Sequence, residues 1–149
     1  NAALMSPEEL CALWREEALV DEADTAVLNR YTPHTEFFRR DRAELYATHR
    51  EDWVLKKLYG RMGDAVAIGR LCPPKEWEQA IAEAAKTPQA YIAQHAFVPV
   101  PIPNGTRQWF PALGVYLIDG AFAAYYSRAD NVGFTTHEAS YVVTAIETA

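Results

Sequence analysis

The chain has 149 residues, half of them hydrophobic, which is enough to bury the core of one compact domain without disulfides or metals. Its formal net charge of −6 and pI near 5.2 argue against a nucleic-acid partner, because such binding depends on clustered lysine and arginine side chains. No apolar run approaches the roughly 18 residues that a membrane-spanning helix needs, so we expect no membrane association.

The two cysteines, Cys11 and Cys72, lie far apart in the sequence and form no CxxC pair. Because a secreted domain of this size has less use for free thiols, they favour a reducing, cytoplasmic compartment. Asn1 and Ala2 precede a well-signalled helix without an initiator methionine, so we interpret them as a cloning remnant and expect a longer parent protein.

Three helices are predicted in the first third of the chain. Residues 6–9 combine a serine N-cap, a proline at the first helical position and a capping-box glutamate. A second helix over residues 24–30 ends before Pro33, because the residue before a proline is pushed out of the helical region. After an extended segment at 35–38, capping-box spacing predicts a short helix over 41–49 that begins at Asp41.

The middle of the chain alternates strands with a helix. Strands are predicted at 53–56 and 65–68, joined as a hairpin by a glycine-containing tip at 59–64. A helix begins at Pro73-Pro74, buries Trp77 and Ile81 on its inner face and ends at Pro88. A further strand follows at 91–94.

The last third is predicted to be β-rich. A loop at 99–105 leads into strands at 109–118 and 122–127, which the turn dipeptide Asp119-Gly120 joins as a hairpin. A final strand is predicted at 141–146. Because helices and strands are mixed throughout and no repeat or composition shift marks a boundary, we expect one α+β domain over residues 1–149.

Lys56 ends a predicted strand and is followed by the glycine-containing tip, with Gly60 and Gly63. A cation and bare backbone N–H groups in this arrangement suit phosphate oxygens. An ordinary glycine hairpin with a solvated lysine explains the same spacing. The tip is not a Walker loop, because no GKS or GKT follows.

Two further places could bind a ligand. Gln94 and His95 end a strand before a proline-rich bend, where an amide and exposed backbone could read the edge of adenine, or could merely cap the strand. Arg128 ends a strand and could clamp a phosphate or carboxylate, or form a surface ion pair. Asp119 is assigned to its turn rather than to a site.

The sequence gives no support for a metal site or for covalent catalysis. The four histidines lack HxxxH or HExxH spacing, and the two cysteines are remote. Ser127 lacks the GxSxG surround of a nucleophile, and Cys11 lies on a predicted amphipathic helix rather than in a basic pocket.

A series of short stretches resembles, in the correct order, the C-terminal half of glutathionylspermidine synthase-like proteins. The stretches are Trp53-Val54-Leu55-Lys56, Gly60-Arg61-Met62-Gly63, Ile92-Ala93-Gln94, Val98-Pro99, Leu113-Gly114-Val115-Tyr116, Ile118-Asp119-Gly120, Ser127-Arg128 and Thr135-Thr136. With the lead-in at residues 28–35, the resemblance covers about residues 24–147.

The resemblance implies a circularly permuted ATP-grasp fold, with ATP-grasp-like lobes in which antiparallel sheets pack against helices. It implies that the adenine is held near Gln94 and His95, and that the catalytic Arg128 lies near the transferred phosphate. The residues that it implies at the ATP phosphates are Lys56, Gly60, Arg61, Met62 and Gly63.

The implied activity is that of an ATP-dependent carboxylate–amine ligase acting through an acyl phosphate. Its cofactors would be ATP and Mg²⁺, with the metal ligands outside this chain. Its partners would be a small carboxylate or amine substrate and the upstream half of the parent protein, so we expect the chain to be inactive by itself. The alternatives are a non-catalytic interaction module that uses the aromatic-rich hairpin at 109–126, and a purely structural lobe.

Overall fold

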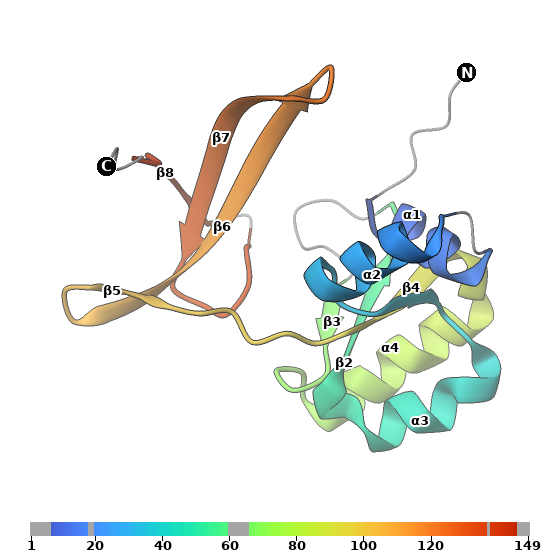
Figure 1. Cartoon of the computed structure of the whole chain (residues 1–149). Coiled ribbons are helices and arrows are strands. Elements are labelled where there is room, and N and C mark those ends of the chain that lie inside the picture. Colours follow the sequence, from blue (N-terminus) through green and yellow to red (C-terminus); the bar gives the residue numbers. More distant parts are fainter. Residues whose placement is uncertain (1–6, 18–19, 60–65, 137, 146–149) are drawn as a thin grey trace. The chain divides into compact units, whose positions relative to one another are not determined.

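The computed structural model describes residues 7–17, 20–59, 66–136 and 138–145, and it is mixed α+β with two antiparallel sheets (Figure 1). The chain divides into two compact units, Asn1–Phe97 and Val98–Ala149. Each unit contains one of the sheets, and each is described below by itself. The α+β class is confirmed, and the expectation of a single domain stays a prediction.

The first unit holds the α-helices of the described ranges. They are α1 (Pro7–Glu16), α2 (Glu22–Tyr31), α3 (Ala43–Thr48) and α4 (Pro74–Lys86). The side chain of Asp21 caps α2 by accepting a hydrogen bond from the Asp24 amide at 2.8 Å, and α2 ends at Tyr31, with Thr32 as its C-cap just before Pro33. None of the helices in the described ranges is long and apolar enough to cross a membrane.

The predicted cap of the third helix is wrong. A 3₁₀ turn over Arg40–Arg42 precedes α3, whose N-cap position is Arg42 and has no side-chain cap. Asp41 forms an exposed ion pair with Arg39 instead, with 2.8 Å between Nη2 and Oδ2. The capping-box spacing therefore identified a helix but misplaced its first turn.

The sheet of the first unit has the strand order β1-β4-β2-β3. Its strands are β1 (Thr35–Phe37), β2 (Trp53–Lys57), β3 (Val66–Ile68) and β4 (Tyr91–His95). The neighbouring strands are all antiparallel, and β2 pairs with β3 as the sequence predicted. Because side chains alternate along a strand, the sheet has two faces with different partners.

One face of this sheet packs against α3 and α4. Its buried cluster includes Tyr46, Trp53, Leu55, Trp77 and Ile81. Trp77 is 1% exposed, as its helical position predicted, and its Nε1 donates a hydrogen bond to the Tyr46 carbonyl at 3.0 Å. This bond fixes α4 against α3 over the sheet.

The opposite face packs against α1. Ala12 of α1 is fully buried against Ile92 of β4 and Leu58, which follows β2. Glu16, at the end of α1, accepts a hydrogen bond from the Phe37 amide at 3.1 Å and so ties the helix to β1. The first unit is therefore an antiparallel sheet with helices on both faces.

The second unit contains the sheet β5-β6-β7-β8. Its strands are β5 (Ile102–Asn104), β6 (Arg107–Ile118), β7 (Ala121–Asp130) and β8 (Ser140–Val142). The turn between β6 and β7 has positive φ at both Asp119 (51°) and Gly120 (77°), which confirms the predicted hairpin. No helix lies in the described residues of this unit, so the expected helix packing is seen only in the first unit.

Two strand predictions in the second unit need correction. The segment at 102–104 was assigned to a loop, but it pairs with the start of β6. The last strand was predicted at 141–146, whereas β8 spans Ser140–Val142, and residues 146–149 are outside the described ranges.

Candidate functional site

Lys56 and Gln94 lie on the same face of the first sheet. In the register of β2 and β4, Val54 is opposite Gln94 and Lys56 is opposite Ile92. Residues two apart on a strand point to one side, so the Lys56 and Gln94 side chains share the α1 face. Of the predicted phosphate-binding residues, Gly60, Arg61, Met62 and Gly63 lie outside the described residues.

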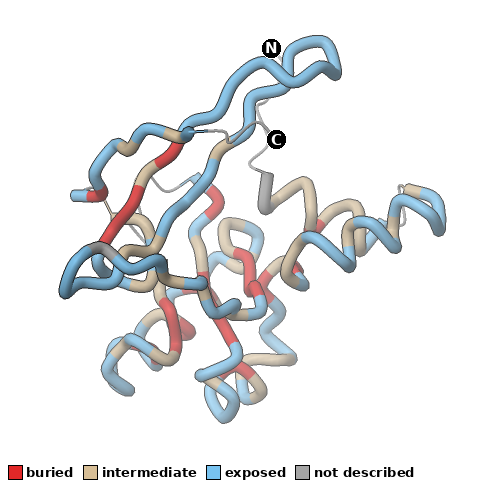
Figure 2. The backbone as a smooth tube through the Cα atoms, turned by 60° about the vertical axis from the view of Figure 1, so that its left-hand side comes forward, coloured by how far each residue is buried: buried red, intermediate tan, exposed pale blue. Residues whose placement is uncertain are grey.

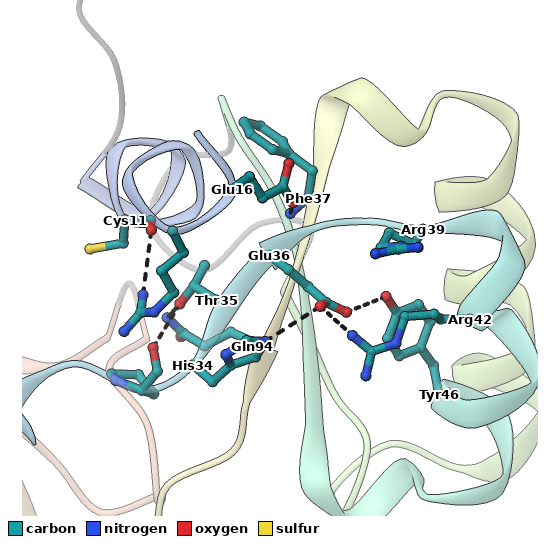
Figure 3. A network of polar contacts seen from close by, with 12 residues as sticks. Cys11, Glu16, His34, Thr35, Glu36, Phe37, Arg39, Arg42, Tyr46 and Gln94 are labelled. Carbon is teal, nitrogen blue, oxygen red and sulfur yellow. Dashed lines mark hydrogen bonds and ion pairs between the residues drawn. The ribbon is translucent and has the colours of Figure 1, made fainter. Parts of the chain in front are cut away.

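Gln94 is buried and hydrogen-bonded within the sheet. Its Nε2 donates to Oγ1 of Thr35 at 2.8 Å, and the Thr35 hydroxyl donates to the Pro33 carbonyl at 3.0 Å (Figure 3). An amide has two N–H donors and one carbonyl acceptor, so this contact uses one of its donors. Any recognition of adenine by this side chain has to use the remaining donor or the carbonyl oxygen.

His95 lies on the opposite face from Gln94. It is directly opposite Trp53 in the register, and the two rings make an edge-to-face contact with 4.4 Å between centroids. The His34 ring is 5.1 Å away. Burial and the neighbouring His34 lower the pKa of His95, so its imidazole is neutral at pH 7. The structure therefore does not bring the two side chains of the predicted adenine site together.

Arg128 lies on β7 in the second unit and binds its own chain. Its Nη2 donates to the carbonyls of Thr136 at 2.9 Å and Ala139 at 3.2 Å. The guanidinium carbon is 5.5 Å from the centroid of the Tyr141 ring. The Nε–H is buried and has no hydrogen-bond partner in the described part of the chain. Arg128 thus holds the segment after β7 rather than forming a surface ion pair.

A buried carboxylate that the sequence analysis missed lies on the α3 face. Glu36 of β1 is 6% exposed and accepts hydrogen bonds from Arg42 and from the Tyr46 hydroxyl, the latter at 2.7 Å. His34 Nε2 is 3.4 Å from the same carboxylate. Figure 3 shows Glu36 directed toward Arg42 and Tyr46. Burial and the nearby Glu36 raise the pKa of Tyr46 well above its usual value, so the phenol stays protonated and donates.

A signal for this carboxylate was present in the sequence. Glu36 lies between Thr35 and Phe37 in a segment that was predicted as a strand, with several arginines a few residues later. A charged residue in a buried strand needs a partner of opposite charge. The sequence could therefore have indicated an ion pair here, though not which arginine forms it.

An open pocket of about 410 Å³ adjoins this network. It is lined by residues from α3, from the segment before β2 and from the ends of β2 and β4. The lining residues include Arg42, Leu45, His49, Asp52, Trp53 and His95. The pocket combines one arginine, one carboxylate and two imidazoles with an apolar wall.

The described residues contain no group of three or more histidine, cysteine, aspartate or glutamate side chains placed to hold a metal ion. A comparison of the sequence with protein-family models finds no match, and a comparison with curated proteins finds none either. The resemblance to glutathionylspermidine synthase-like proteins therefore stays a prediction from the sequence.

Proposed function

We propose that the chain is the ATP-binding part of a cytoplasmic, glutathionylspermidine synthase-like carboxylate–amine ligase with a circularly permuted ATP-grasp fold. The observation that supports this most directly is that Lys56 and Gln94 share one face of an antiparallel sheet. Lys56 is on β2, the strand that leads toward the glycine-containing segment at 60–63.

In this proposal the chain binds and orients ATP rather than forming a covalent bond to it. Lys56 offsets charge on the phosphates, and the backbone N–H groups of the segment at 60–63 surround their oxygens. Arg61, five residues after Lys56 in the sequence, would add a second cation. Gln94 and the backbone near His95 orient the adenine.

The proposed reaction transfers the γ-phosphoryl group of ATP to a substrate carboxylate and releases ADP. An amine then attacks the acyl phosphate and phosphate leaves, which forms an amide bond. The resemblance implies a role for Arg128 at this step, where a guanidinium would offset the charge of the transferred group. Acidic residues of the upstream half would hold Mg²⁺, which would supply neutralisation of the phosphate charge.

Calorimetric titration with ATP and Mg²⁺ tests the nucleotide site. Lys56→Ala removes a charge-assisted contact to phosphate worth about 1.5–3 kcal/mol, so we expect Kd to rise about tenfold or more. Lys57→Ala is the matched control, because Lys57 is the next residue on β2 and points to the other face. We expect the control to change Kd less than about threefold.

Equal affinities of the two variants for ATP would contradict the proposal. If the chain alone does not bind ATP, the same pair of variants is measured in a protein that includes the upstream half. A loss confined to Lys56→Ala in that protein supports the nucleotide site, and the absence of any binding there contradicts it.

A second candidate, the interaction module, is favoured by the β6–β7 hairpin. Leu113, Val115, Leu117 and Phe122 are each more than half exposed, and Figure 2 shows exposed residues along most of the hairpin. Exposed apolar surface of this kind marks contact sites. Under the ligase proposal, the upstream half of the protein covers this surface.

Sedimentation of the chain with the upstream half of the protein distinguishes the ligase proposal from the interaction module. Val115→Glu is expected to abolish association with the upstream half while leaving the affinity for ATP unchanged, because Val115 is an exposed residue of β6 and is not among the residues proposed to contact ATP. If the chain binds the upstream half but the Lys56→Ala and Lys57→Ala variants do not differ in ATP affinity, the interaction module is the better description.

A further inference from the structure

The pocket on the α3 face has groups of opposite charge in its wall. Arg42 and Asp52 both line it, and they come from opposite ends of the segment that joins β1 to β2. Both charges are close enough to shift the pKa of His95, which lines the same pocket. A ligand that carries one positive and one negative charge can therefore contact both Arg42 and Asp52.

Arg42 is held in place before any ligand arrives. Its Nη1 donates to the buried Glu36, and its guanidinium carbon lies 5.5 Å from the centroid of Trp53 and 6.0 Å from that of Tyr46. The arginine side chain is still 32% exposed. Since a guanidinium has five N–H donors, one contact with Glu36 leaves donors for a carboxylate in the pocket.

Asp52 is also fixed, although by its backbone. Its N–H donates to the His49 carbonyl at 2.9 Å, and its carbonyl accepts from the Ala96 N–H at 2.8 Å. These bonds tie Asp52 to the end of α3 and to the residue after β4. Its carboxylate has no ion-pair partner within the described ranges, so it can accept hydrogen bonds from a ligand ammonium group.

The remaining wall consists of apolar residues and two imidazoles. Leu45, Trp53 and Ala96 are apolar, His49 and His95 supply the imidazoles, and the neutral His95 can form a hydrogen bond without adding charge. The volume of about 410 Å³ lies in the range of small-molecule sites. A small molecule with one ammonium, one carboxylate and an apolar side chain matches each part of this wall.

We infer that this pocket binds a free α-amino acid, with the carboxylate on Arg42, the ammonium on Asp52 and an apolar side chain near Leu45. The site goes beyond the proposed ATP-binding function. It lies on the opposite face of the sheet from Lys56 and Gln94, so it does not depend on a nucleotide.

Binding is tested by ¹⁵N–¹H NMR titration of the chain with L-phenylalanine, without nucleotide. Two matched probes each lack one charge: phenylalanine amide has no carboxylate, and 3-phenylpropionate has no ammonium. We expect L-phenylalanine to shift the amide signals of Asp52 and Ala96 and to bind about tenfold tighter than either probe, as the loss of one charge-assisted hydrogen bond requires.

Asp52→Asn tests the ammonium contact, and Asp41→Asn is its control, because Asp41 is an exposed aspartate that does not line the pocket. We expect Asp52→Asn to weaken L-phenylalanine about tenfold while leaving 3-phenylpropionate unchanged. A substitution of Arg42 would not isolate the carboxylate contact, because Arg42 also forms an ion pair with the buried Glu36.

The inference is overturned if L-phenylalanine shifts no amide signal in the pocket, or if Asp52→Asn and Asp41→Asn bind it equally. Equal affinity for L-phenylalanine and 3-phenylpropionate also overturns it and identifies an anion site at Arg42 instead. Lys56→Ala should leave L-phenylalanine binding unchanged, so failure of this inference is distinct from failure of the ATP site.

Discussion

Replacing Tyr46 by phenylalanine should destabilise the first unit by breaking the Glu36 network. The Tyr46 side chain is fully buried, and its hydroxyl donates to the Glu36 carboxylate at 2.7 Å. Its ring packs against Phe38 and Trp53, with 5.1 and 5.0 Å between ring centroids. The variant therefore leaves a buried carboxylate with one donor fewer.

The magnitude follows from the charge on the acceptor. A hydrogen bond to a charged group contributes about 1.5–3 kcal/mol, compared with about 1 kcal/mol between neutral groups. Arg42 and His34 still contact Glu36 in the variant, so its charge is not left unpaired and the larger cost of about 3–5 kcal/mol for an isolated buried charge does not apply. We expect Tyr46→Phe to cost about 1.5–3 kcal/mol.

Urea unfolding followed by tryptophan fluorescence measures this cost. Tyr91→Phe is the matched control, because Tyr91 packs against the same cluster while its hydroxyl has no hydrogen bond to any described residue. We expect the control to cost less than about 0.5 kcal/mol. A double-mutant cycle with Glu36→Gln should give a coupling of about 1 kcal/mol or more. Equal costs for the two tyrosine variants, or a coupling of zero, would refute the reasoning.

Two further predictions concern a close contact and a pH dependence. Gly69→Ala should destabilise the first unit by about 1–3 kcal/mol, because a Cβ there would lie 1.9 Å from the Arg50 carbonyl oxygen. Gly133→Ala is the control: its Cβ would meet only Pro99 at 3.8 Å, so it should change the free energy of unfolding little in the same urea assay. Burial alone would raise the pKa of Asp130, but hydrogen bonds from Thr136 and from backbone amides lower it overall. Asp130 therefore stabilises the fold in full well above its unfolded-state pKa of about 4, and this contribution is lost as the pH falls through the folded-state pKa. The free energy of unfolding should decrease on acidification below about pH 4, and the decrease should be shallower in Asp130→Asn. Equal slopes for the two proteins would contradict this.

Local signals in the sequence were sufficient for most of the secondary structure. Pro33 ended a helix, and Asp119-Gly120 gave the β6–β7 turn with the positive φ values that this dipeptide tolerates. The missed β5 strand also had a local signal. Gly105 and Thr106 form the turn between β5 and β6, and a glycine at the first turn position, where φ is 62°, is typical of a hairpin, but the prolines around it favoured a loop. Proline is tolerated in short edge strands such as β5.

The candidate site was less accessible to sequence reasoning. Period-two alternation already implies that Gln94 and His95 point to opposite faces, so their separation could have been predicted. The partners of Arg128 are backbone carbonyls brought near by the chain after β7, and no sequence pattern encodes them. Lys56 was placed on its strand correctly, and its role at the phosphates stays a prediction.

The two neighbouring polar residues of β1 have a structural consequence for the whole first sheet. Thr35 holds Gln94 on the α1 face, and Glu36 holds Arg42 on the α3 face. Because β1 has only three residues, its pairing with β4 gives little intrinsic preference for one register. A slip by one residue would turn Glu36 toward the apolar contact of Ala12 with Ile92, where a carboxylate has no partner. The buried polar pairs thus select the register that keeps Thr35 beside Gln94 on the α1 face and Glu36 beside Arg42 on the α3 face.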